Sequence, residues 1–160
     1  MTTSAHLEFL GNKGSTTFTD TSGKVWTGAG GAHIDNNALT VDGAGDYIST
    51  PAHADFDVGN GDFTIDFNLL LHNDTENNTY LLGYNLSIDI GVLFQDPGWY
   101  LLFSIYNPTI NSMISEIITL DTWHHISLER HGTFLNSYID GVLGSNAMGI
   151  GTSTINSSVS

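Results

Sequence analysis

The sequence has 160 residues, with 3 basic and 17 acidic side chains, 7 His and no Cys, which gives a formal net charge of −14. This length suits one domain, so we expect a single domain over residues 1–160. The negative charge disfavours binding to nucleic acid and to anionic membranes, and the lack of cysteine excludes disulfides and thiolate metal sites.

Composition and the amino-terminal residues predict a soluble, all-β protein. Charged residues make up 12% of the chain and aromatic residues 11%, so the polar surface must come mainly from Thr, Ser, Asn and Gly. The first residues lack the basic head and apolar run of a signal peptide, and no apolar stretch approaches the roughly 18 residues needed to span a bilayer.

Short strands separated by turn residues are expected along the whole chain. In chain order they are predicted at residues 6–9, 38–42, 46–50, 63–69, 80–84, 100–106 and 115–120, around Ile126 and Leu128, at 134–139, and from Val142. The clearest is 63–69, because Phe63, Ile65, Phe67 and Leu69 alternate strictly with polar residues. Turns are predicted at residues 43–45, 73–78, 96–98, 107–108 and 130–133, and at Asp140-Gly141, a favoured hairpin pair.

Many short strands at this spacing predict an antiparallel β-sandwich or jelly roll of two sheets. Four stretches carry a more specific resemblance: residues 14–24, 38–51, 55–67, and 121–130 together with 138–141. Their order and separation resemble the laminin-G-like branch of the concanavalin A-like sandwich superfamily, in particular modules of tailed-bacteriophage virion proteins. The motif residues also have scaffold explanations, since Trp123 can cap the core and Asp140-Gly141 can close a hairpin.

The resemblance implies a jelly roll that lacks the last strands of the family. Family members usually continue beyond the Asp-Gly hairpin with two more strands, whereas this sequence stops at Ser160. We therefore expect either a smaller sheet or an open sheet edge, which a strand from a neighbouring chain can pair. The expected partners are further copies of the chain and a major capsid or tail protein of a phage.

The sequence offers little support for catalysis, and we expect no enzyme activity. Glucan hydrolases on this scaffold use carboxylates spaced as Glu-x-Asp-x-x-Glu, but residues 87–91 contain a single carboxylate. Asp55 and Asp57 are two residues apart and lie in a predicted turn. His124 and His125 are neighbours on a predicted strand, so their side chains point to opposite faces and cannot chelate one ion.

Two kinds of binding site stay open. Calcium prefers oxygen ligands, and Asp42, Asp46, Asp55 and Asp57 supply carboxylates, with solvated loop acids as the alternative. A sugar needs an exposed aromatic platform, and the candidates are Trp26, Trp99 and Tyr100, with core packing near turns as the alternative.

The resemblance implies a structural protein of a tailed-phage virion, and the lack of catalytic motifs makes the expected role non-enzymatic. A capsid decoration or cement protein is favoured over a tail or baseplate module, because the sequence shows neither a fibre shaft nor heptads. The alternative function is a lectin-like module that binds glycans on the host surface, with or without calcium.

Overall fold

The computed structural model describes residues 5–42, 44–72, 79–84, 88–107, 109–144, 147–152 and 154–155. These residues form an all-β protein with antiparallel sheets, which confirms the predicted class. Within them, the short 3₁₀ turn η1 (Ala54–Phe56) is the sole helical element, and no helix is long and apolar enough to cross a membrane. The chain divides into two compact units, residues 1–56 and 57–160, which are described in turn. A single domain stays a prediction.

The first unit contains a three-stranded antiparallel sheet and a separate hairpin. The sheet has the order β1-β2-β5, and the hairpin pairs β3 with β4. Their bounds are β1 (Thr17–Thr19), β2 (Val25–Ala29), β3 (His33–Asp35), β4 (Ala38–Thr40) and β5 (Tyr47–Ser49). Phe18 and Ile34 are buried, and the ring of Phe9 meets that of Phe18 edge-on at 5.5 Å.

Backbone geometry explains two features of the first unit. Asn36 and Asn37 both have positive φ, 50° and 60°, as the tight two-residue turn between β3 and β4 requires. Gly28 lies in β2 and donates its N–H to Thr16 O at 2.6 Å. A Cβ at Gly28 would lie 2.7 Å from the carbonyl oxygen of Ala32, so this strand position requires glycine.

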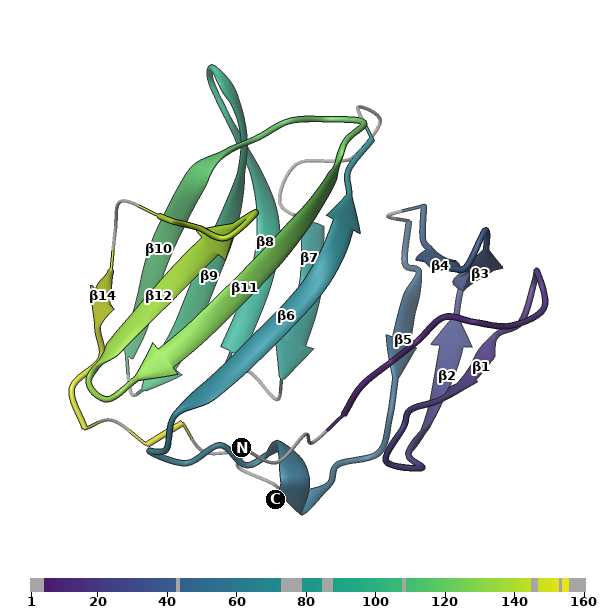
Figure 1. The fold of residues 1–160 in the computed structure, drawn as a ribbon, viewed down its shortest axis with the longest axis horizontal. Coiled ribbons are helices and arrows are strands. Elements are labelled where there is room, and N and C mark those ends of the chain that lie inside the picture. The colour runs from purple at the N-terminus through teal and green to yellow at the C-terminus, as the bar shows by residue number, and fades with distance from the viewer. Residues whose placement is uncertain are drawn as a thin grey trace. The chain divides into compact units, whose positions relative to one another are not determined.

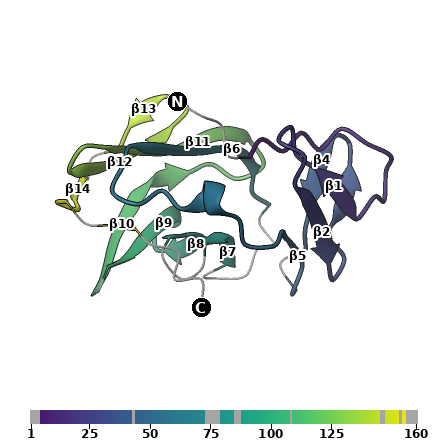
Figure 2. The ribbon, with the colours of Figure 1, turned by 90° about the horizontal axis from the view of Figure 1, so that it is seen from below.

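The second unit contains two larger antiparallel sheets. One has the order β10-β9-β8-β7, and the other has the order β13-β12-β11-β6, with β14 also paired to β12. The strands are β6 (Phe63–Leu70), β7 (Thr79–Tyr84), β8 (Ile88–Gln95), β9 (Gly98–Asn107), β10 (Thr109–Ile118), β11 (Trp123–His131), β12 (Phe134–Ile139), β13 (Val142–Leu143) and β14 (Met148–Gly149). Figures 1 and 2 show the two sheets as two layers.

Both sheets of the second unit bury alternate side chains in one hydrophobic core. Phe103 is fully buried on β9, and Ile126 and Leu128 are 0% and 1% exposed on β11. Two antiparallel sheets that share a core are consistent with the predicted β-sandwich. The other buried core residues are Phe63, Leu71, Ile88, Ile90, Val92, Trp99, Leu101, Ile105, Ile118, Leu135, Ile150 and Ile155.

The strand predictions succeed best where the alternation of apolar and polar residues is strict. The predicted strand 63–69 corresponds to β6, and the strands predicted at 38–42, 46–50, 80–84, 100–106 and 134–139 correspond to β4, β5, β7, β9 and β12. The strand predicted at 115–120 is part of β10, which begins at Thr109. The predicted turn at 96–98 joins β8 to β9. The predicted turn at 73–78, Gly43 and Pro108 lie outside the described residues.

Other strand predictions are wrong or missing. Residues 6–9 form no strand. They are held by other contacts: Thr21 N–H donates to His6 O, and Phe9 packs on Phe18. The turn predicted at 130–133 begins later, since Arg130 and His131 still belong to β11. Strands β1, β2, β3, β8 and β14 were not predicted.

Candidate functional site

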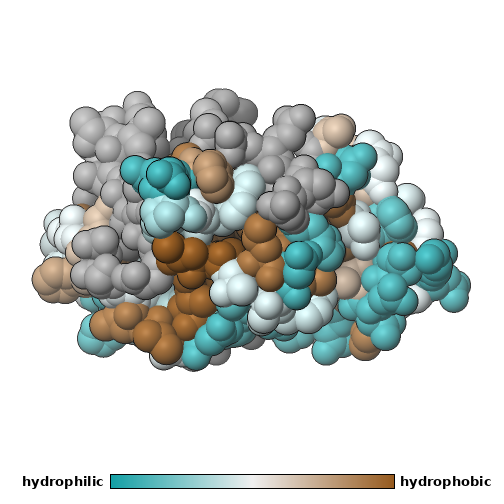
Figure 3. All heavy atoms as spheres, turned by 90° about the horizontal axis from the view of Figure 1, so that it is seen from above, coloured by the Kyte–Doolittle hydropathy of each residue, from teal (hydrophilic) through white to brown (hydrophobic). Residues whose placement is uncertain are grey.

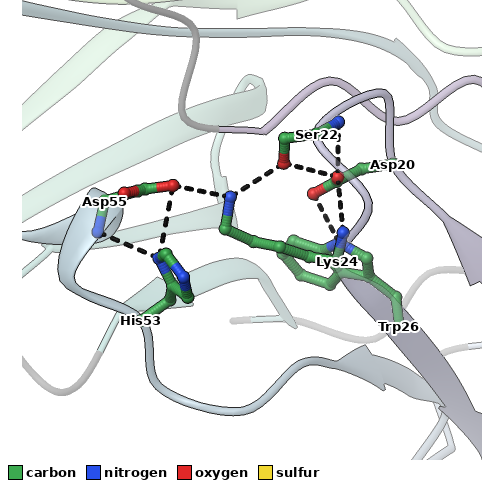
Figure 4. Close-up of polar contacts among 6 residues, drawn as sticks. All are labelled: Asp20, Ser22, Lys24, Trp26, His53 and Asp55. Atoms are coloured by element: carbon green, nitrogen blue, oxygen red, sulfur yellow. Dashed lines mark hydrogen bonds and ion pairs between the residues drawn. The ribbon is translucent and has the colours of Figure 1, made fainter.

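A buried aspartate organises the turn between β1 and β2 in the first unit. Asp20 is 4% exposed, and its Oδ1 accepts hydrogen bonds from Ser22 N–H at 2.8 Å, Ser22 Oγ–H at 2.6 Å and Lys24 N–H at 2.9 Å. Its Oδ2 accepts one from Trp26 Nε1–H at 3.2 Å (Figure 4). Burial by itself raises the pKa of Asp20, but these hydrogen bonds outweigh burial and lower the pKa to about 2.

Lys24 connects this turn to η1. Its Nζ lies 2.8 Å from Asp55 Oδ2 and donates to Ser22 Oγ at 2.8 Å (Figure 4). The same Nζ lies 5.5 Å from the centre of the Phe56 ring. Lys24 is the main cause that lowers the pKa of Asp55, and nearby His53 contributes to the same effect. The polar groups of these side chains therefore bond to one another. This is typical of a structural network, and it fixes η1 on the β1–β2 turn.

The depressed pKa of Asp20 predicts that the first unit loses stability in acid. The folded-state pKa, about 2, is below the ordinary value of 3.8, so the ionised carboxylate contributes stability above about pH 4 and loses it as the pH falls toward 2. We expect the difference in unfolding free energy between the wild type and Asp20→Asn to shrink over this range. Urea denaturation followed by Trp26 fluorescence at several pH values measures it.

The matched control for this experiment is Glu8→Gln, which removes an exposed acid of the same unit that lies 3.6 Å from His6. Its effect on stability should be small and should not follow the pattern of Asp20→Asn. A difference between wild type and Asp20→Asn that stays constant from pH 5 to about pH 2 would contradict the assignment of the low pKa.

Two of the acids predicted as calcium ligands, Asp42 and Asp46, lie in the loop between β4 and β5 and bind backbone amides. Asp46 Oδ1 accepts a hydrogen bond from Gly31 N–H, and its Oδ2 accepts one from Asp42 N–H at 3.0 Å. These two bonds, led by that of Gly31, lower the pKa of Asp46. Asp42 Oδ1 accepts from Ala44 N–H at 2.8 Å. Both acids therefore act as turn residues here.

The remaining two acids of the predicted calcium set also have partners. Asp55 is paired with Lys24, and Asp57 Oδ1 accepts a hydrogen bond from Gly59 N–H at 3.3 Å. Over the described ranges, no group of three His, Asp or Glu side chains comes together in a way that could hold a metal ion. The structure thus does not gather the predicted ligands, and calcium binding stays a prediction.

Two of the predicted sugar platforms are occupied by packing within the protein. Trp99 is 8% exposed, belongs to the core of the second unit and packs edge-on against Phe94 at 5.2 Å. The structure therefore gives Trp99 the core-packing alternative and does not place it at the surface as a sugar platform would require. Trp26 is half-buried, bonded to Asp20 and packed against Phe56 at 6.0 Å. Tyr100 is half-buried on the other face of β9.

The outward face of the four-stranded sheet carries apolar side chains. Leu93 on β8 and Ile117 on β10 both pair with Tyr100 of β9, and Leu102 follows two residues later on the same face. Ile117 is 50% exposed, and the other three are half-buried. We call these four residues the apolar sheet face. Apart from this face, Figure 3 shows apolar residues gathered among polar ones on the surface seen from above the view of Figure 1.

A second exposed area lies on the outward face of the five-stranded sheet. Trp123 is 55% exposed, which corrects the expectation that it caps the core. It pairs with Leu70 of β6, and two residues further along the same face His125 pairs with Asn68. His125 Nε2 lies 3.8 Å from Asp66 Oδ1. Trp123 therefore presents an indole beside polar side chains, a site that the sequence did not single out for binding.

His124 lies on the opposite face of β11 and holds the Asp140 hairpin in place. Its Nδ1 is 2.7 Å from Asp140 Oδ2, and its Nε2 is 3.1 Å from Thr119 O. His125 N–H donates to Asp140 Oδ1 at 2.9 Å. The His124 bond, followed by the His125 bond, lowers the pKa of Asp140. The side chain of His124 is 11% exposed and that of His125 is 50% exposed, as expected for residues on opposite faces.

Comparisons with family models, with curated proteins and with solved structures find no match to this chain.

Proposed function

We propose that the chain is a non-enzymatic structural protein of a tailed-phage virion, which acts by binding other proteins. A capsid decoration or cement protein is the favoured form, and a tail or baseplate module is the other. The observation that carries the proposal is the apolar sheet face, formed by Leu93, Tyr100, Leu102 and Ile117 on one side of an antiparallel sheet. A partly exposed apolar group of this kind is typical of surfaces that bind other proteins.

The proposal includes a concanavalin A-like jelly roll of the laminin-G-like type. It is supported by the sequence resemblance and by two antiparallel sheets that share one core in the second unit. A cement protein needs a contact of about 1,000 Å² or more, which the symmetry of the shell then repeats. The net charge of −14 fits such a role, because it keeps the protein from adhering to packaged DNA.

Labelling of intact virions tests this proposal directly. Antibodies raised against the full chain are applied to purified particles of the encoding phage and viewed by immunogold electron microscopy, and quantitative mass spectrometry gives the copy number. Hundreds of copies over the shell support a decoration protein, and a few copies at the tail tip support a tail or baseplate module. Particles that lack the protein would overturn the proposal.

The second candidate function is a lectin-like module for host-surface glycans, and the exposure of Trp123 favours it. An exposed indole can stack on the apolar face of a sugar ring, while Asn68, Asp66 and His125 offer hydrogen-bonding groups to its hydroxyls. In this candidate function the sugar platform is Trp123 on β11 instead of Trp99.

For this candidate we expect Trp123→Ala to abolish binding of the full chain to a glycan array. The matched control is Trp26→Phe, which changes an indole that is half-buried in the Asp20 network. A chelator in the binding buffer tests the calcium-dependent form. Equal binding by wild type and Trp123→Ala would eliminate this site, and no binding by the wild type would eliminate the lectin function.

A further inference from the structure

Strand β6 forms the edge of the five-stranded sheet and is long and regular. All eight residues, Phe63–Leu70, pair with β11 without a shift of register, and β11 is its one partner among the described strands. The strand contains no proline or lysine, the residues that commonly protect an edge from further pairing. Its outer edge therefore offers backbone N–H and C=O groups to another strand.

The other edges of the two sheets are short or irregular. β13 and β14 have two residues each, the pairing of β7 with β8 shifts register between Tyr80 and Leu82, and that of β10 with β9 shifts between Ile114 and Ile117. Short strands and bulges discourage edge-to-edge pairing. Among the described strands of this unit, β6 is thus the edge best suited to pair.

The core is incompletely covered at β6. Ile65, Phe67 and Leu69 face the core but remain half-buried, whereas Ile126 and Leu128, on the same face of the neighbouring β11, are 0% and 1% exposed. A further strand with apolar residues at alternate positions would cover these three side chains and exclude water from them.

We infer that β6 pairs antiparallel with β6 of a second copy of this chain, so that the five-stranded sheet continues across a two-fold axis at Phe67. In this register residues 64–70, seven of the eight residues of β6, overlap with the same residues of the second copy, and apolar side chains lie opposite one another on the core face. On the outward face it places Asp66 opposite Asn68 of the second copy, a carboxylate facing an amide.

Neighbouring registers are less favourable. An axis at Asp66 would bring the two Asp66 carboxylates opposite each other, and like charges across a strand pair are destabilising. An axis at Asn68 would place Asp66 opposite Leu70, which is half-buried. An axis at Ile65 would leave Leu69 and Leu70 without a partner strand. The charge pattern of β6 therefore selects its own copy in one register.

Charge variants at Asn68 test this dimer, which stands independently of the proposed function. Sedimentation velocity of the full chain over the micromolar range should show a monomer–dimer equilibrium. Asn68→Asp puts two like-charged pairs across the axis and should weaken the dimer roughly fivefold, whereas Asn68→Lys should strengthen it by a similar factor. The double variant Asp66→Asn with Asn68→Asp exchanges the pair and should restore wild-type affinity.

The matched control is Thr133→Asp, which adds the same charge at an exposed turn between β11 and β12 and should leave dimerisation unchanged. Circular dichroism establishes that each variant is folded; if Asn68→Asp is not, Asn68→Lys still tests the opposite direction. A wild-type monomer throughout this concentration range would overturn the inference. So would a dimer whose affinity does not respond to the Asn68 variants.

Discussion

Replacing Phe103 by alanine is expected to lower the free energy of unfolding of the second unit by about 3–5 kcal/mol. Phe103 is 0% exposed on β9, and its neighbours across the sheet are Ile90 on β8 and Met113 on β10. The substitution removes a fully buried ring from a core that both sheets share. The cost combines the lost transfer of the ring out of water with the cavity that remains.

Urea denaturation followed by tryptophan fluorescence measures this loss, because Trp99, one of the three tryptophans, is buried in the same core. The matched control is Val142→Ala, which shortens a side chain that is 69% exposed and should change stability by less than about 0.5 kcal/mol. Similar losses in the two variants would contradict the assignment of Phe103 to the centre of the core.

Strict alternation and turn chemistry were sufficient to predict part of this fold. Residues 63–69 alternate in type, and β6 buries their apolar set toward the core as expected. Asp140-Gly141 forms the predicted tight turn with φ values of 52° and 78°. Both signals are local. The alternation in residues 63–69 and the turn at Asp140-Gly141 each depend only on neighbouring residues in the sequence.

Features that depend on distant partners were not predictable in this way. In β8, Ile88 and Ile90 lie on one face of the strand, and strict alternation would require polar residues between and after them. Gly91 and Leu93 stand at such positions, so the strand shows no clear alternation of apolar and polar residues. β2 contains Gly28, a poor strand former, and the reason for it lies in the carbonyl of Ala32, which only the folded chain brings close.

The candidate sites show the same limit. The sequence supplies the aromatic candidates but does not tell which of them are exposed. Trp99 is buried and Trp123 is exposed because of the face of its strand on which each lies relative to the other sheet. Of the predicted calcium ligands, Asp46 lies in a loop and binds the amide of Gly31, whereas Asp55 belongs to η1 and pairs with Lys24. Composition supplies the candidates, and tertiary contacts decide between them.

Arg130→Ala is expected to lower the free energy of unfolding of the second unit by about 3 kcal/mol. Arg130 is 3% exposed and follows Ile126 and Leu128 on the core face of β11. Its Nε donates to Gly132 O at 3.1 Å, Nη1 to Gly59 O at 3.4 Å and Nη2 to Gly151 O at 3.4 Å. One guanidinium therefore joins three separate segments of the chain.

The loss should be large because the substitution removes a buried guanidinium together with its charge-assisted hydrogen bonds to the carbonyls of Gly59, Gly132 and Gly151. Arg130→Lys should recover only part of the stability, since one ammonium group cannot reach three divergent carbonyls as the planar guanidinium does. Lys13→Ala is the matched control, because it also removes one positive charge. Lys13 forms an ion pair with Asp35 in which the lysine side chain is 76% exposed. Its removal should therefore lower the free energy of unfolding by at most about 1 kcal/mol. If Arg130→Ala costs no more than Lys13→Ala in urea denaturation, Arg130 does not hold these segments together.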